Sequence, residues 1–264
     1  KQADLTRLIT HAETAMRASK AKGGACYSFF APSMLQGGRE QTELLLDLRQ
    51  ALGKNQLELY YQPKIHAPSG EITGAEALMR WHHPQRGMVS PVVFIPIAER
   101  YSLIDALGDW VIETACAQVR AWRDQGLRMR VAINLSAYQL RDPQLPERIA
   151  AALERHRVNP ELLTCEITES VAMEDAARTI ELFAKLAAVG VSISIDDFGT
   201  GYSSLSYLRK LPATELKIDR SFVLDLEASA DARAGVDAVI KLARAVGLKV
   251  VAEGVETEEQ NQIL

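Results

Sequence analysis

The sequence is short of several features that define other classes of protein. No apolar run in its 264 residues approaches the roughly 18 to 20 residues of a membrane span, and its amino terminus has no apolar signal region. Its net charge of −4 lacks the basic excess that polyanion-binding surfaces carry. The glycine-rich segment around Gly199 lacks the Gly-Lys-Ser/Thr ending of a phosphate-cradling loop. We therefore expect no membrane contact by this chain and no nucleic-acid polymer as a partner.

Cysteine is also scarce, and its spacing is not that of a metal site. Cys26, Cys116 and Cys165 are scattered along the chain, and Cys165 lies inside a strand-like run, where a small buried hydrophobe is the usual role. This usage is typical of a reduced, intracellular protein. A chain of this length with 47% hydrophobic residues can bury a sizeable core.

Polar side chains close or follow six strand-like runs. For example, Asn134 follows the run 130–133, and Glu253 follows the run 249–252. The positions concerned are Glu76, Asn134, Glu166, Asp196 with Asp197, Lys217 and Glu253. We interpret this series as six strands that deliver polar groups to one place.

The alternation of side chains along these runs indicates a closed interior. In the run 191–196, the odd-numbered residues are Val and Ile, and the even-numbered residues are Ser, Ser and Asp. The runs 131–136 and 216–219 repeat this asymmetry. Successive strand residues point to opposite faces, so one face is apolar and the other is small or polar. A barrel with outer helices requires this arrangement, and the polar groups then point into or over the barrel.

Strands and helices alternate along most of the chain, which favours an α/β fold with a parallel sheet. Strands are predicted at 56–64, 71–80, 128–135, 161–168, 190–196, 214–219 and 248–253. Helices are predicted at 103–124, 146–156, 173–189, 202–210 and 231–246. Seven strands predict a TIM-like (β/α)8 barrel with one strand missing.

The first 30 or so residues do not follow this alternation. Apolar residues at helical spacing predict an amphipathic helix, residues 23–24 are two glycines that break it, and residues 27–30 are predicted as a short strand. A further helix over 38–54 leads into the barrel. We interpret the segment before it as the end of another domain.

Seven motifs taken together resemble the EAL-domain cyclic di-GMP phosphodiesterase family. They are Tyr61-Gln62-Pro63, Glu76-Ala77-Leu78, Asn134-Leu135-Ser136, Glu166-Ile167-Thr168-Glu169-Ser170, the segment 196–205, Lys217-Ile218-Asp219 and the segment 252–257. The match covers about residues 40–264 in the family's order and spacing. Residues 1–32 resemble the tail of a GGDEF domain without its cyclase signature. We therefore expect a GGDEF remnant at 1–32 and an EAL domain at 33–264, with an antiparallel first strand and a last strand that would follow Leu264.

The resemblance implies hydrolysis of cyclic di-GMP to linear pGpG with two Mg²⁺ or Mn²⁺ ions per site. Glu76, Asn134, Glu166 and Asp196 would hold the first ion, and Asp196 would bridge to a second ion held by Asp197 and Glu253. Lys217 would orient the attacking water, with Glu76 and Glu253 as the other catalytic groups. The positions that would contact substrate are Gln62, Leu78, Arg80, Asn134, Asp219 and Glu256. Hard divalent ions prefer such oxygen ligands.

The resemblance also implies a homodimer and a loop that couples the dimer interface to the metals. The coupling positions are Glu169, Phe198, Gly199, Thr200, Gly201, Tyr202, Ser203 and Ser204. The resemblance to this family further implies that the chain lies in the bacterial cytoplasm, either in a separate protein or in the cytoplasmic part of a membrane-anchored sensor.

Each assignment has a structural alternative. A polar residue at a strand end often caps the next helix, and Lys217 is open to a purely structural role as the partner of an acid. Asp196 and Asp197 would repel each other without a cation, which favours a metal site. Adjacent His82 and His83 face opposite ways on a strand, so a packing or turn role is expected for them. At the level of function, the alternative is a catalytically silent cyclic di-GMP receptor.

Overall fold

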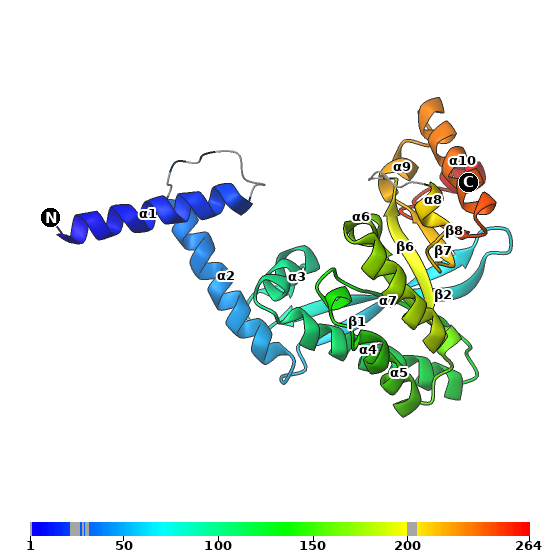
Figure 1. The fold of residues 1–264 in the computed structure, drawn as a ribbon, viewed down its shortest axis with the longest axis horizontal. Coiled ribbons are helices and arrows are strands. Elements are labelled where there is room, and N and C mark those ends of the chain that lie inside the picture. The colour runs from blue at the N-terminus through cyan, green and yellow to red at the C-terminus, as the bar shows by residue number, and fades with distance from the viewer. Residues whose placement is uncertain (1, 22–26, 28, 30–31, 200–204) are drawn as a thin grey trace.

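Seven strands follow one another in a curled, mixed sheet (Figure 1). The computed structural model describes residues 2–21, 27, 29, 32–199 and 205–264. The strands of the path, in spatial order, are β1 (Leu57–His66), β2 (Glu71–His83), β4 (Arg130–Asn134), β5 (Leu163–Thr168), β6 (Ser192–Phe198), β7 (Glu215–Ile218) and β8 (Lys249–Ala252). The first pair is antiparallel, and each later pair is parallel. The sheet forms a TIM-like half-barrel, so the predicted fold class and the antiparallel first strand are confirmed.

Helices connect the parallel strands and pack on the outer face of the sheet (Figure 1). The long connections are α4 (Ile104–Asp124), α5 (Leu145–Arg155), α7 (Ala176–Val189) and α10 (Ala230–Ala245). The short elements are α3 (Pro91–Arg100), α6 (Glu169–Glu174), α8 (Leu205–Leu208), α9 (Arg220–Leu224), α11 (Glu258–Ile263) and the 3₁₀ turns η1 (Gln139–Arg141) and η2 (Pro160–Leu162). Helices α1 (Gln2–Ala21) and α2 (Pro32–Ala51) precede the sheet and project to one side of it.

Strand alternation decides what each face of the sheet buries. Ile133, Ile193 and Ile218 are fully buried in the main apolar core, which lies between the sheet and its outer helices. Cys165 belongs to this core, as predicted, and burial raises the pKa of its thiol to about 12. The opposite face carries buried polar groups such as Ser194. The predicted asymmetry between an apolar outer face and a polar inner face is confirmed.

Several predicted elements differ from the structure. The helix predicted at 173–189 begins at Ala176, because Asp175 has non-helical angles (φ −140°, ψ 87°) and its side chain accepts a hydrogen bond from the Arg178 backbone as an N-cap. The strand predicted at 27–30 is wrong where it is described, since Tyr27 and Phe29 lie in no strand. Of the helix predicted at 202–210, residues 202–204 lie outside the described residues, and the described part, α8, ends at Leu208 and not at Lys210. Strand β3 (Gly87–Val89), which pairs with β2, and helix α3 were not predicted.

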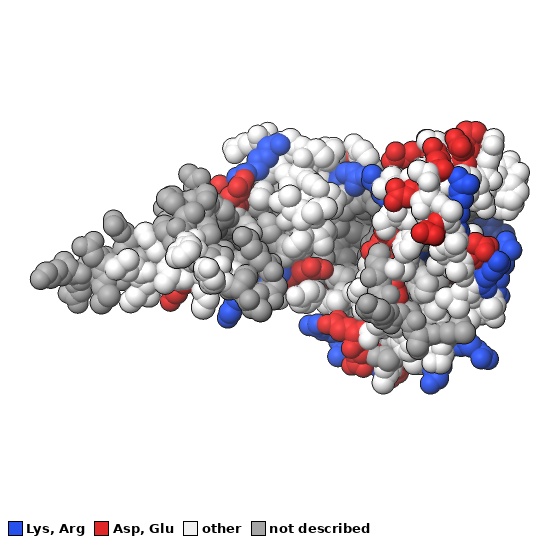
Figure 2. Space-filling model, turned by 90° about the horizontal axis from the view of Figure 1, so that it is seen from above, with Lys and Arg blue, Asp and Glu red and all other residues white. Residues whose placement is uncertain are grey.

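Two further observations concern the surface charge and the membrane-spanning capacity of the helices. On the face seen in Figure 2, acidic and basic side chains are interspersed, and the basic ones do not merge into one patch. Over the residues that the structure describes, no helix combines the length and the apolarity needed to cross a membrane.

Candidate functional site

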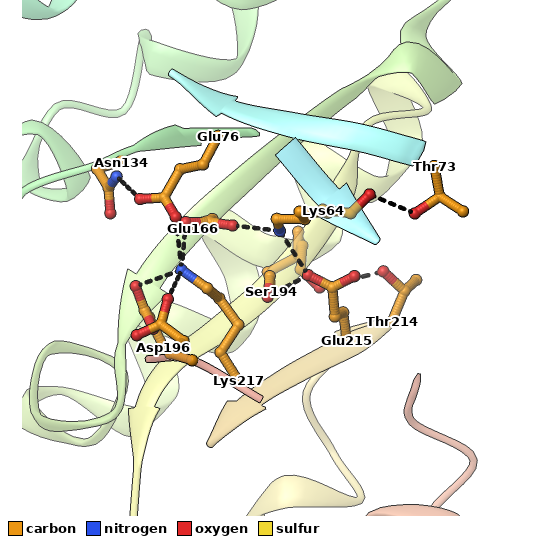
Figure 3. A network of polar contacts seen from close by, with 12 residues as sticks. Lys64, Thr73, Glu76, Asn134, Glu166, Ser194, Asp196, Thr214, Glu215 and Lys217 are labelled. Carbon is orange, nitrogen blue, oxygen red and sulfur yellow. Dashed lines mark hydrogen bonds and ion pairs between the residues drawn. The ribbon is translucent and has the colours of Figure 1, made fainter. Parts of the chain in front are cut away.

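Lys217 lies at the centre of the convergent polar groups (Figure 3). Its side chain is 1% exposed, and its Nζ atom contacts four carboxylates. The distances are 3.1 Å to Glu76 Oε2, 2.8 Å to Glu166 Oε2, 3.0 Å to Asp196 Oδ2 and 2.6 Å to Glu253 Oε1. These acids come from β2, β5, β6 and the segment after β8. The structure thus brings together side chains that lie up to 177 residues apart.

The register between neighbouring strands places the Asn134 amide beside the carboxylates of the site. Strands β4 and β5 pair Asn134 with Glu166, and β1 and β2 pair Gln62 with Glu76. Asn134 Nδ2 donates a hydrogen bond to Glu76 Oε1 at 2.8 Å. Burial would raise the pKa of Glu76, but Lys217 and this hydrogen bond outweigh burial and lower it. Glu76 is therefore held ionised and in a fixed orientation.

Two groups of carboxylates share Asp196. Glu76, Glu166 and Asp196 form one group, and Asp196, Asp197 and Glu253 form the other. Within each group the ligand oxygens lie within 4.8 Å of one another. We call these five acids the acidic cluster. Lys217 neutralises only part of their charge, and oxygen-rich sets of this kind suit Mg²⁺ and Mn²⁺. The residues present therefore fit two divalent cations with one shared ligand.

Burial raises the proton affinity of most of the acidic cluster. It raises the pKa of Glu166 to about 7, although Lys217 opposes the shift. Burial also raises the pKa values of Glu253 and Asp197, and the neighbouring Asp196 adds to the shift at both. Carboxylates that resist ionisation without a counter-charge gain most from a bound cation.

Lys217 keeps its proton at neutral pH. Burial alone would lower its pKa, but the carboxylates of Glu166 and Asp196 and two further acids raise the pKa above the usual value for lysine. A protonated ammonium donates hydrogen bonds and cannot accept a proton. The side chain is thus equipped to orient or polarise an oxygen, and it cannot serve as a general base in this state.

We expect the metal-free protein to lose stability between about pH 4.5 and about pH 7. The pKa of Glu166 is near 4.5 when unperturbed and about 7 in the folded protein, so the folded state binds the proton more tightly. Such a group stabilises the fold below its unfolded pKa, and the contribution is lost as pH rises through the folded pKa. The loss should amount to about 1–3 kcal/mol.

Thermal denaturation in chelator at several pH values measures this loss. Glu166→Gln is the matched control, since it removes the titrating group and should flatten the decline. Saturating Mn²⁺ should also flatten it, because divalent cations bind the ionised carboxylates. A melting temperature that rises across this interval in chelator would contradict the expected protonation of Glu166.

Asp197 joins the acidic cluster through an irregular backbone. Adjacent strand residues normally point to opposite faces. Here the β6–β7 register shifts between Ile195 and Phe198, and Asp197 has a left-handed φ of 54°. Its backbone N–H donates to Asp196 Oδ1 at 2.8 Å. This bulge turns Asp197 to the side of Asp196, and bulges commonly re-aim side chains in this way.

A hydrogen bond connects the residue after the bulge to α6, the helix that follows β5. Buried Glu169, the first residue of α6, accepts a hydrogen bond from the Gly199 backbone through Oε2 at 2.9 Å. Gly199 has φ 102°, and a Cβ atom there would lie 2.7 Å from the Phe222 ring, so glycine is required. Phe198 is buried. The other predicted loop residues, Thr200, Gly201, Tyr202, Ser203 and Ser204, lie outside the described residues.

The predicted substrate contacts lie around the acidic cluster. Leu78 and Arg80 follow Glu76 at alternate positions of β2 and so share its face. Arg80 lies over the Tyr60 ring, 5.3 Å from its centroid. Gln62 is exposed on the same face of β1.

Two further predicted contacts lie at the rim. Asp219 caps α9 by accepting from the Ser221 backbone at 2.9 Å, as the structural alternative proposed. Glu256 is exposed, and its Oε1 lies 3.9 Å from Arg220 Nη2. Asp219 also shares a hydrogen bond with Asp197. The rim is thus connected to the acidic cluster through Asp219.

The two adjacent histidines do not form a metal pair. Exposed His82 and buried His83 face opposite ways. His83 Nε2 lies 3.1 Å from Asp47 Oδ2, and its Nδ1 accepts from the backbone of Gln85 and Arg86. The predicted packing and turn role is confirmed for His83.

Three residues of the interior network were not predicted as site residues, although alternation places Ser194 on the interior face with Asp196. Lys64 Nζ lies 2.7 Å from Glu166 Oε1 and 3.0 Å from Glu215 Oε1 (Figure 3). Ser194 Oγ donates to the same Glu215 oxygen at 3.0 Å. Alternation could have found them, because each lies two residues from a predicted site residue on the same strand. Two surface cavities lie away from this network, one of about 220 Å³ between α4 and α5 and one of about 440 Å³ on α6.

The family match and the similar proteins agree on one family. Residues 46–264 match the EAL domain. The bifunctional diguanylate cyclase/cyclic di-GMP phosphodiesterase MucR of Pseudomonas aeruginosa is 49% identical over 258 residues, which are 97% of this chain and 38% of MucR. The cyclic di-GMP phosphodiesterase NbdA of the same organism is 43% identical over 254 residues, or 96% of this chain and 32% of NbdA. This chain therefore spans about a third of the length of these curated relatives.

A solved structure agrees with the family match. The PaMucR phosphodiesterase in complex with c-di-GMP superposes with a TM-score of 0.82 at 51% sequence identity. The match covers 84% of this chain and 90% of the other.

Proposed function

Because this chain belongs to the EAL domain family, we propose that it is a metal-dependent phosphodiesterase that hydrolyses cyclic di-GMP to linear pGpG. The observation that carries the proposal is the acidic cluster, in which two carboxylate groups share Asp196 around Lys217. The relatives named as cyclic di-GMP phosphodiesterases and the similar domain solved with c-di-GMP support the choice of substrate.

The first cation would be held by Glu76, Asn134, Glu166 and Asp196, and the second by Asp196, Asp197 and Glu253. Two divalent cations so held supply an activated water, neutralise the phosphoryl oxygens and assist the leaving alkoxide. Mg²⁺ and Mn²⁺ are the ions that this oxygen-only donor set favours. Asn134 would contribute its neutral Oδ1 to the first cation, since its hydrogen bond to Glu76 uses only Nδ2.

Lys217 would orient the attacking water by donating a hydrogen bond. Its buried position leaves the side chain few rotamers, so the donor is held in one place. A donor fixed in this way stabilises charge that develops on a reacting oxygen. Arg80 would contact a substrate phosphate with its fork of donors, and Gln62 would position the ligand beside Glu76.

We also propose a homodimer in which Glu169 and the segment from Phe198 communicate with the acidic cluster. The Glu169–Gly199 hydrogen bond supports the proposed communication, because it joins α6 to the residue that follows the bulge at Asp197. The division into a GGDEF remnant at 1–32 and an EAL domain at 33–264 is part of the same proposal.

Addition of Mn²⁺ to the chelated protein tests the proposed function. We expect no turnover of cyclic di-GMP in chelator and a rate that rises with Mn²⁺ binding. Mn²⁺ at 100 times its dissociation constant should also stabilise the fold by about 2.7 kcal/mol for each cation bound. Turnover that persists in chelator would contradict the metal requirement. Tight binding of cyclic di-GMP without turnover in saturating Mn²⁺ would identify a receptor.

A further inference from the structure

Each oxygen of Glu166 has its own lysine. Lys217 Nζ lies 2.8 Å from Oε2, and Lys64 Nζ lies 2.7 Å from Oε1. The Glu166 side chain is 0% exposed, whereas that of Lys64 is 17% exposed. Figure 3 shows the carboxylate of Glu166 between the two ammonium groups, which approach from different sides. A buried carboxylate contacted by a cation at both oxygens has little freedom to rotate.

Lys64 reaches Glu166 from across the barrel interior. It belongs to β1, which pairs only with β2 among the described strands, whereas Glu166 belongs to β5. Its second partner, Glu215, belongs to β7 and lies 3.0 Å away. The Ser194 hydroxyl on β6 donates to Glu215. We call Lys64, Glu166, Glu215 and Ser194 the cross-barrel network, since it joins four strands through side chains alone.

Lys64 is held at both its backbone and its side chain. Its backbone carbonyl accepts a hydrogen bond from Thr73 Oγ1 at 3.3 Å, and its Nζ atom contacts Glu166 and Glu215. Burial would lower the pKa of Lys64, but the carboxylates of Glu166 and Glu215 outweigh burial and raise it. Removing the ammonium would leave Glu166 Oε1 buried without a partner of opposite charge, which is strongly unfavourable.

We propose that Lys64 is a positioning residue for the metal site, acting through Glu166. It occupies Oε1, so that Glu166 presents Oε2 alone toward the side where Glu76 Oε2 and Asp196 Oδ2 converge on Lys217. Groups that hydrogen-bond to metal ligands fix their orientation, and their loss typically weakens metal binding about 10- to 100-fold. This inference rests on the proposed function only in taking Glu166 as a metal ligand.

A purely structural role for Lys64 makes a different prediction. A strut between β1 and β5 would change the stability of the fold when removed, and would leave the affinity of the remaining carboxylates for a cation unchanged. A positioning role changes the affinity for the cation itself. Metal affinity, measured without substrate, therefore separates the two roles.

The test compares Mn²⁺ binding by the wild-type protein and its Lys64 variants, from the electron paramagnetic resonance signal of free Mn²⁺. Lys64→Met and Lys64→Gln remove the charge, and Lys64→Arg retains it. We expect about 10- to 100-fold weaker Mn²⁺ binding in the first two and partial rescue by arginine. Glu215→Gln is the matched control, because it keeps an oxygen for Lys64 and leaves the Lys64–Glu166 contact in place. It should bind Mn²⁺ much as the wild type does.

Thermal denaturation in chelator identifies which charge-removing variant is folded, and one folded variant is enough. Wild-type Mn²⁺ affinity in that variant would overturn the positioning role of Lys64 while leaving the proposed function intact. A wild-type protein that binds no Mn²⁺ would overturn both. Mn²⁺ binding that depends on Lys64 in a protein without turnover would support the positioning role and contradict only the proposed reaction.

Discussion

Replacing Asp196 by Asn is expected to lower the turnover of cyclic di-GMP by about 10³-fold or more. Asp196 is the one acid that belongs to both carboxylate groups, and its Oδ2 lies 3.0 Å from Lys217 Nζ. Asparagine keeps the shape of the side chain but removes the charge that two cations would share. Metal ions contribute several kcal/mol of charge stabilisation to phosphoryl chemistry, and each 1.4 kcal/mol or so is about tenfold in rate. The measurement is kcat in saturating Mn²⁺, with the number of bound Mn²⁺ ions determined in parallel.

Asp237→Asn is the matched control for this substitution. Asp237 is an exposed acid of α10 that pairs with Lys241 one turn away, at 2.6 Å. The same chemical change there should leave both the rate and the Mn²⁺ stoichiometry as in the wild type. If Asp196→Asn retained turnover within about tenfold of the wild type, the shared-ligand assignment would be wrong, since that loss is below what one metal contact contributes.

Replacing Lys217 by Met is expected to affect stability and turnover in separable ways. In chelator, the substitution removes the cation from four carboxylates, and breaking a buried ion pair from one side costs about 3–5 kcal/mol. Mn²⁺ should restore stability, because the bound cations replace the missing charge. Turnover in saturating Mn²⁺ should nevertheless stay about 10²- to 10³-fold below that of the wild type, since a preorganised donor to the reacting oxygen is lost.

This combination decides between the two roles that the sequence leaves open for Lys217. A structural partner of the acids would become dispensable once Mn²⁺ is bound, so both stability and turnover would recover. Recovery of stability alone is the result that a water-orienting ammonium requires. Lys241→Met, which removes an exposed lysine of α10, is the control for the loss of a positive charge.

Strand alternation predicts much of the site, because it is a local property that the chain cannot avoid. It places Asn134, Asp196 and Lys217 on the interior face without any knowledge of the partners. Parallel strands joined by helices then bring their carboxyl ends to one edge of the barrel. The convergence of these side chains on Lys217 therefore follows from pattern and topology together.

Alternation fails at Asp197, and the reason is a backbone irregularity. A regular strand would turn Asp197 away from Asp196. The bulge and the left-handed φ of 54° reverse that direction. The register shift arises from the pairing of β6 with β7, which are separate in sequence, so residues 196 and 197 alone do not predict it.

The cross-barrel network was missed for a different reason. Lys64 and Glu215 each share a face with a predicted site residue two positions away, but their contacts join positions 102 and 151 residues apart. Which lysine meets which acid depends on the width of the barrel and on side-chain rotamers. The predicted helix boundaries were wrong by a few residues. At Asp175, for example, α6 ends and α7 begins, and the Asp175 side chain caps α7.

The most direct measurement is the conversion of cyclic di-GMP by the purified protein in Mg²⁺ or Mn²⁺, beside a Glu76→Ala variant. Glu76 contacts both Lys217 and Asn134 and belongs to the first carboxylate group. We expect the wild type to produce linear pGpG and the variant to produce none. Tight binding of cyclic di-GMP by the wild type, with Mn²⁺ bound and no pGpG formed, would contradict the phosphodiesterase and leave a receptor.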